Sequence, residues 1–237
     1  MSVEVKPTEL NGGGRLYLAR TVIETPHGKE SKRNTLPLFG RGYHNQVMQQ
    51  VDKAGLLRQP TSEVCSLANL VLQNLDDPVL AELYENMKFS NGGLWTATES
   101  DVGSEDILVY DVSSGESPSR AELVKRSNDG DPTVAKIGFD FKRGYIPLNE
   151  LMKHSYFLGQ MRNMDVAQRT VDQLTASEKG AWVYGPTPDM VGQKRKTAVD
   201  FDDNGNALCF YGDYHGCSRD YYAVGVEKTG EASAQNQ

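Results

Sequence analysis

The segment Val64–Leu75 (VCSLANLVLQNL) constrains the fold of this chain more than any other. It follows Pro60, and Thr61 or Ser62 stands where the cap of a helix N-terminus is expected. The predicted helix is apolar nearly all round, and a helix with that pattern is buried inside a protein rather than resting on one surface. The rest of the chain therefore has to surround it.

The segments around that helix mix helical and strand signals without a regular β–α alternation, which favours an α+β fold over a doubly wound parallel sheet. Further helices are expected over residues 47–54, from the Asp77 cap to Met87, after the Ser119–Glu122 capping box, and around 148–152 and 167–174. Strands are expected over residues 15–25, 94–98, 106–112, 135–141 and 181–184. Residues 26–41 are polar and contain two prolines, so a loop is expected there.

The clearest local signal is a β-hairpin near the C-terminus. In TAVDFDDNGNALCFYGD, two strand-like runs flank Asn204-Gly205, and Asn-Gly favours the positive φ angles of a hairpin turn. Residues 221–226 predict a final strand with Tyr222, Val224 and Val226 on one face. We therefore predict an α+β fold in which a helical middle packs on a mostly antiparallel sheet, completed by the hairpin and the final strand.

No shift in composition marks a domain boundary along the 237 residues. We expect residues 1–228 to form one globular α+β domain and residues 229–237 to be a disordered polar tail. The acidic stretch TESDVGSED and the basic run Lys194–Lys196 are both predicted to be solvated loops.

Bulk composition limits the class of partner. Apolar residues make up 38% of the chain and charged residues 24%, as in soluble globular proteins. The net charge of −7 makes nucleic acid an unlikely partner, because nucleic-acid binding depends on Lys and Arg. Every apolar run is far shorter than the roughly 18 residues of a membrane span. With three cysteines and no secretory signal, a cytoplasmic location and no membrane partner are expected.

A calcium site is one interpretation of the predicted hairpin. Asp200, Asp202 and Asn204 alternate before Gly205, as the oxygen ligands of a calcium loop do. The twelfth position of such a loop requires a bidentate Glu, but Tyr211 occupies it. The alternative is a hairpin turn in which Asp and Asn simply suit the backbone.

A zinc site is a second interpretation, from Cys209, His215 and Cys217. Zinc favours thiolate and imidazole ligands, four in a structural site, so a fourth ligand such as Cys65 would have to come from elsewhere. The alternative is a buried Cys209 in a strand, with His215 and Cys217 on an exposed turn. We predict no cofactor, with zinc and calcium as the alternatives that these patterns leave open.

A thiol nucleophile is a third interpretation. Cys65 falls in the first turn of the predicted buried helix, where a helix N-terminus can lower the pKa of a thiol. His215 follows about 150 residues later, an order that papain-like thiol hydrolases use. Asp213 or Asp220 could orient its imidazole. The alternative is a core residue, because Cys65 shares a helix face with Ala68 and Leu72.

The stretch YGDYHGCSRDYYAVGV, residues 211–226, concentrates the remaining candidates. Arg219 lies between acidic residues there, and it could pair with Asp213 or Asp220 and order a loop held by a rigid sheet. The candidate ligand-binding residues are Tyr211, Asp213, His215, Cys217, Arg219 and Asp220, with Trp95 and Trp182 as a possible apolar wall. The leading hypothesis is a non-enzymatic binding or interaction module that uses this loop and sheet, with a protein or small molecule as its ligand. The alternatives are a thiol-dependent hydrolase built on Cys65 and His215, and a protein with a structural zinc site.

Overall fold

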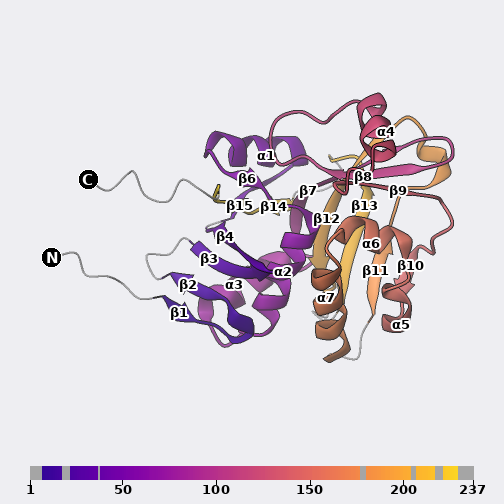
Figure 1. Ribbon diagram of the computed structural model, residues 1–237. Helices are drawn as coiled ribbons and strands as arrows, with labels where there is room; N and C mark the ends of the chain where they lie inside the picture. The colour runs from indigo at the N-terminus through magenta and orange to yellow at the C-terminus, as the bar shows by residue number, and fades with distance from the viewer. Residues whose placement is uncertain are drawn as a thin grey trace.

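The computed structural model describes residues 7–17, 22–36, 38–176, 180–203, 207–216 and 221–228. The fold is α+β, with two mostly antiparallel sheets and helices between and beside them (Figure 1). The predicted fold class is confirmed. The polar tail at 229–237 and the Asn204-Gly205 turn lie outside the described residues.

The first sheet joins strands from both ends of the chain. In order across the sheet these are β1 (Thr8–Glu9), β2 (Arg15–Tyr17), β3 (Val22–His27), β4 (Glu30–Thr35), β15 (Gly225–Val226) and β6 (Leu57–Arg58). The predicted loop over residues 26–41 is therefore wrong. Strands β3 and β4 form a hairpin whose turn contains Gly28 at φ 62°. Only Asn34 is buried in β4, and the strand has no apolar side chain, so its sequence does not carry the apolar alternation of a half-buried strand.

The second sheet forms the larger part of the molecule. Its strands run in the order β10 (Gly144–Ile146), β11 (Ala181–Tyr184), β13 (Leu208–Tyr214), β12 (Lys194–Phe201), β7 (Leu94–Val102), β14 (Tyr221–Ala223) and β5 (Phe39–Gly42), with β8 (Ile107–Asp111) paired to β7 and β9 (Val134–Ile137) to β8. The predicted hairpin strands are β12 and β13, which pair antiparallel. The β11–β13 and β7–β14 pairs are parallel.

The buried helix lies at the centre, as predicted. In α2 (Thr61–Leu72), every residue but the last is buried, between the sheets and the helices α3 (Pro78–Met87), α6 (Ser155–Met161) and α7 (Met164–Ala176). Its cap differs from the prediction, because Pro60 is the N-cap and Thr61 is already helical. The predicted Asp77 cap of α3 is confirmed, since the Asp77 carboxylate accepts hydrogen bonds from two backbone N–H groups.

Three other expectations are corrected. The acidic stretch is largely strand, because β7 continues to Val102 and buries Glu99 and Asp101. The basic run lies within β12, where Arg195 is only 4% exposed. The final strand is two strands, β14 and β15, which belong to different sheets. In each case, pairing with a strand from a distant part of the chain supplies backbone hydrogen bonds that the local sequence does not reveal.

The two faces of the second sheet are covered differently. Helices α2, α3, α6 and α7 cover one face and form the main core with it. On the other face, α1 (His44–Lys53) packs Val47, Met48 and Val51 against Trp95 and Tyr221, which covers the β7–β14 side. The aromatic side chains of β11 and β13 on that same face remain half-buried. The remaining helices, α4 (Arg120–Asn128) and α5 (Leu148–Leu151), are peripheral.

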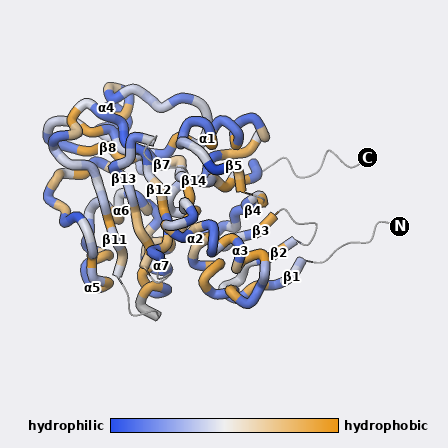
Figure 2. The backbone as a smooth tube through the Cα atoms, turned by 180° about the vertical axis from the view of Figure 1, so that it is seen from behind, coloured by the Kyte–Doolittle hydropathy of each residue, from blue (hydrophilic) through white to orange (hydrophobic). Residues whose placement is uncertain are grey.

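Hydrophobic and hydrophilic stretches alternate along the backbone (Figure 2). Within the described ranges, none of the helices combines the length and the hydropathy needed to cross a bilayer.

Candidate binding face on the second sheet

Four aromatic rings lie on one face of the sheet, and a β-bulge brings the fourth of them there. On β11, Trp182 and Tyr184 alternate with buried residues, and Tyr184 is the register partner of Tyr211 on β13. The β12–β13 register then shifts, so that Ala198 pairs with Tyr211 but Lys196 pairs with Tyr214. The extra residue in β13 reverses the alternation of side chains, and Tyr214 comes to the same face as Tyr211.

The four rings, Trp182, Tyr184, Tyr211 and Tyr214, form what we call the aromatic row. Successive ring centroids are 6.2, 5.2 and 5.0 Å apart, and successive planes lie within 6° of parallel. Tyr145 on β10 extends the row with an edge-to-face contact to Trp182 at 5.6 Å. Parallel, offset rings at this spacing stabilise one another, so the row presents a firm apolar surface.

One end of the row is anchored in the core. The Tyr214 ring lies 5.9 Å from that of the buried Tyr221, whose own ring lies 4.9 Å from that of Trp95. The Tyr221 hydroxyl donates to Asp200 Oδ2 at 3.1 Å. Burial and the neighbouring Asp200 carboxylate raise the pKa of both Tyr211 and Tyr221, so these phenols stay protonated and able to donate.

The other three rings of the row border a cavity of about 240 Å³, which we call the aromatic cavity. It is lined by Phe89, Trp182, Tyr184, Asp202, Asp203, Cys209 and Tyr211. Backbone hydrogen bonds fix both carboxylates: Asp202 Oδ1 accepts from Ala207 N–H at 3.2 Å, and Asp203 Oδ1 from Ser90 N–H at 2.8 Å. Aromatic walls beside carboxylates are the surroundings that favour an organic cation. The volume lies below the usual range for drug-sized ligands, so it suits one side chain or a small group.

A guanidinium already contacts the aromatic row. Arg143 lies over the Tyr184 ring, 6.0 Å from its centroid, and its Nη2 pairs with Asp213 Oδ2 at 2.6 Å. Burial raises the pKa of Asp213, although the nearby Arg143 opposes that shift. Asp213, expected to orient His215 or to pair with Arg219, thus binds a residue that directly precedes the edge strand β10. Arg219 itself, like Asp220, lies outside the described residues.

The described geometry separates the zinc candidates. Cys209 lies near the start of β13 and His215 directly follows its last residue, so the extended strand separates them by roughly 20 Å, at about 3.3 Å per residue. Ligands that far apart cannot share one zinc ion, since each ligating atom must lie within about 2.3 Å of the metal. Cys217 lies outside the described residues. In the part of the chain that the structure describes, no group of three His, Cys, Asp or Glu residues is placed to hold a metal.

Two of the three candidate calcium ligands make hydrogen bonds to other parts of the protein. Asp200 is fully buried and accepts the hydrogen bond from Tyr221, and Asp202 holds the backbone of Ala207. The third candidate, Asn204, lies outside the described residues, so the calcium loop stays a prediction.

Cys65 lies in the main core with no exposed area. Burial raises the pKa of its thiol, which is the opposite of what a nucleophilic thiolate requires. The candidate base, His215, is exposed beyond the end of β13. These surroundings match the core interpretation of Cys65 and give the thiol hydrolase no support.

Some residues of this face were not predicted from the sequence, namely Phe89, Arg143, Tyr184, Asp203 and Tyr214. The run AWVY carries a usable signal, because its two aromatic residues alternate with apolar ones and therefore share one face of a strand. Phe89 and Arg143 carry no such signal, since they reach the site from outside the strands that form it.

Neither the protein-family models nor the curated proteins compared with this sequence give a match. A solved structure does resemble it: a protein of Nanoarchaeota in which the C-type lectin fold accommodates massive sequence variation. The likeness covers 85% of this chain and 100% of that chain, with a TM-score of 0.58 and 14% sequence identity. At this identity the match bears on the fold alone, and this chain shares the C-type lectin fold.

Proposed function

We propose that this chain is a protein-binding module on a C-type lectin fold, with the aromatic row as its binding face. A basic side chain of the partner enters the aromatic cavity, where the rings contact its cationic group and the Asp202 and Asp203 carboxylates neutralise it. The observation that carries the proposal is the meeting of aromatic walls and two fixed carboxylates in one cavity.

The composition of the face supports a protein partner. Tyr and Trp are enriched in protein interfaces because they give a large contact area, together with a polar tip, at low cost in conformational entropy. The contact between Arg143 and Tyr184 supports a basic anchor, since it places a guanidinium on the same row. The net charge of −7 would also attract a basic partner.

The likeness to the Nanoarchaeota protein supports a binding role at the level of the fold. A fold that accommodates massive sequence variation keeps its backbone while its side chains change. Such a scaffold suits a binding face whose side chains set specificity. This support is an analogy between folds, and the proposal for the site depends on the geometry of the cavity.

Trp182 is a natural reporter for a test. Trp95 is 1% exposed, whereas Trp182 is half-buried and lines the cavity, so a ligand should change the fluorescence of Trp182. The probes are end-blocked Gly-Lys-Gly, Gly-Arg-Gly and Gly-Glu-Gly. We expect the two basic peptides to bind in the millimolar range, about −4 kcal/mol, because each supplies one anchor of a larger interface. The acidic peptide should give no change.

A double variant, Asp202→Asn with Asp203→Asn, sharpens the test. Each amide oxygen can still accept the backbone hydrogen bond, so the loop is kept while two charges are lost. We expect affinity for the basic peptides to fall about 3- to 10-fold, as the loss of roughly 1 kcal/mol implies. The matched control, Glu116→Gln with Asp129→Asn, removes two exposed charges from the segment between β8 and β9 and should change nothing. Equal binding of the acidic peptide, or tighter binding of tetramethylammonium than of either basic peptide, would contradict the proposal.

A further inference from the structure

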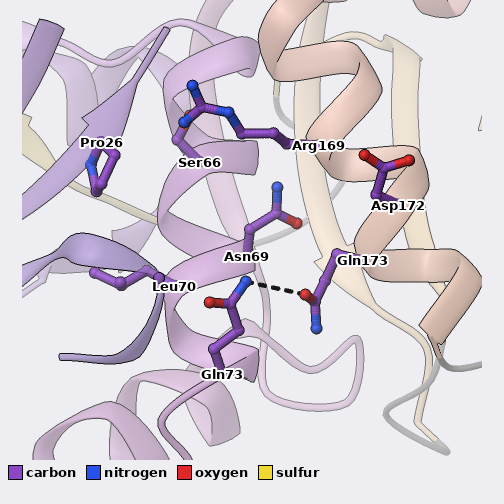
Figure 3. Close-up of a pocket in the computed structure, with 9 residues that line it drawn as sticks. Pro26, Ser66, Asn69, Leu70, Gln73, Arg169, Asp172 and Gln173 are labelled. Carbon is purple, nitrogen blue, oxygen red and sulfur yellow. Dashed lines mark hydrogen bonds between the residues drawn. The ribbon is translucent and has the colours of Figure 1, made fainter. Parts of the chain in front are cut away.

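A second cavity, of about 410 Å³, lies between α2 and α7 beside the end of β3 (Figure 3). Its volume is within the range of small-molecule sites. None of the residues that line it belongs to the aromatic row or the aromatic cavity. A ligand of this cavity would therefore bind at a site separate from the proposed protein-binding face.

Asn69 is the central polar group of this cavity. It is 8% exposed, in a helix that is otherwise mostly apolar. Its Nδ2 donates to Thr170 Oγ1 at 3.3 Å, while the Thr170 hydroxyl itself donates to the Val166 carbonyl at 2.9 Å. This arrangement fixes the orientation of the amide. The Asn69 Oδ1 atom is buried and has no hydrogen-bond partner among the described residues. A buried acceptor of this kind needs a donor, and the cavity is where a ligand could supply one.

Charged groups of both signs border the cavity from α7. Arg169 and Asp172 are one turn apart and exposed, so their side chains lie on the same side of the helix. Figure 3 shows the Arg169 guanidinium reaching over Ser66 of α2, with the Asp172 carboxylate on the α7 side and Asn69 between the two helices. Arg169 Nη2 donates to the Gly28 carbonyl at 3.0 Å, which holds the guanidinium at this position.

Two further contacts shape the cavity. Gln73 Nε2 donates to Gln173 Oε1 at 3.0 Å and bridges the two helices at one end (Figure 3). At the other end, His27 Nδ1 lies 3.0 Å from Ser66 Oγ. Burial, followed by the charge of Lys32, lowers the pKa of His27 to about 4, so this imidazole is neutral near pH 7. Arg169 is then the cationic group of the cavity wall at that pH.

We infer that this cavity binds a small zwitterion of the α-amino acid type. Its carboxylate pairs with Arg169, and its ammonium donates to Asn69 Oδ1 and faces Asp172. A guanidinium recognises a carboxylate through parallel hydrogen bonds, and an ammonium supplies donors but no acceptor, which is what the buried oxygen requires. Neighbouring side chains of opposite charge on one helix match a ligand whose own charges are close together.

The test is calorimetric titration of the full chain with glycine, L-alanine, L-serine and L-glutamine. Acetate and methylammonium serve as half-ligands that carry one charge each. We expect at least one amino acid to bind with a Kd of about 1 mM or below, and both half-ligands to bind at least about 10-fold more weakly. Equal binding of a half-ligand, or no heat with any of the amino acids at about 10 mM, would overturn the inference.

Two variants separate binding from folding. Arg169→Gln changes an exposed residue, and we expect it to weaken amino acid binding at least about 10-fold. Asn69→Leu removes the buried oxygen with little change in size, so binding should be lost while the unfolding temperature is unchanged or higher. Lys125→Gln, on the exposed side of α4, is the control for loss of a positive charge. Unchanged binding in both cavity variants would overturn the inference, whatever the outcome for the aromatic row.

Discussion

The ion pair between Lys196 and Glu99 offers a sharp test of how the second sheet is stabilised. The two residues are register partners in β12 and β7, and Lys196 Nζ bonds Glu99 Oε1 directly. Their side chains are 13% and 2% exposed. Glu99 Oε2 also accepts hydrogen bonds from the Tyr110 hydroxyl at 3.1 Å and from Ser117 Oγ at 2.6 Å. Glu99 is therefore a buried carboxylate with Lys196 as its counter-ion.

Replacing Lys196 with Met should cost about 3 kcal/mol of unfolding free energy. Removing one partner of a buried ion pair costs about 3–5 kcal/mol, because the other charge is left uncompensated. We expect a cost at the lower end of this range, because the hydrogen bonds from Tyr110 and Ser117 still stabilise the Glu99 carboxylate in the variant. An exposed pair would be worth only about 0–1 kcal/mol.

The cost should also depend on pH. Burial alone would raise the pKa of Glu99, but Lys196 and the hydrogen bond from Ser117 lower it overall. In the natural chain, the contribution of Glu99 to stability is thus fully present above its unfolded pKa of about 4.3 and is lost as pH falls through the lower folded pKa. In the variant, burial is no longer opposed by the ammonium, so the pKa of Glu99 rises. The difference in stability between the two proteins should therefore be greatest near pH 7 and shrink on acidification.

Urea unfolding followed by tryptophan fluorescence, near pH 7 and near pH 5, measures both effects. The double variant Glu99→Gln with Lys196→Met removes both charges and should recover at least half of the loss. A cost below about 1 kcal/mol, or the same cost at both pH values, would refute the reasoning, because the pair would then behave as an exposed one.

Two further predictions concern the core. The Cys65 thiol should react with iodoacetamide only when the chain unfolds, because it has no exposed area and burial raises its pKa; mass spectrometry of the labelled native protein checks this, and labelling without unfolding would contradict it. Replacing Tyr156 with Phe should cost about 1–3 kcal/mol, because the Tyr156 hydroxyl lies 2.9 Å from Ser100 Oγ and 2.8 Å from Gln160 Nε2, and both groups are buried. An unchanged urea midpoint would mean that these groups find other partners.

The sequence is informative where a local pattern determines the structure. The apolar helix α2, the Asp77 cap and the strands of the C-terminal hairpin were all predictable, because each depends on residues a few positions apart. The strand character of Glu99 and Asp101 was not, because it depends on Lys196 and Arg120 from distant segments to neutralise the carboxylates.

The candidate site shows the same limit. Tyr211 and Asp213 were expected at a site, and both lie at the aromatic row or next to it. The bulge that brings Tyr214 beside Tyr211 depends on the pairing of β13 with β12, which the sequence of one strand does not reveal. The partner of Asp213 is Arg143, which lies 70 residues away in the chain.

The position of β14 and β15 has a consequence for how the protein is made. These strands follow every other described strand in the sequence, yet β15 lies between β4 and β6, and β14 between β7 and β5. During synthesis, the strands of neither sheet can therefore all be paired until residues 221–226 have been added. A nascent or truncated chain that lacks them would expose unpaired strand edges on both sheets, which are templates for aggregation. Pairings between residues so far apart in sequence also form slowly, so β14 and β15 are expected to join their sheets late in folding.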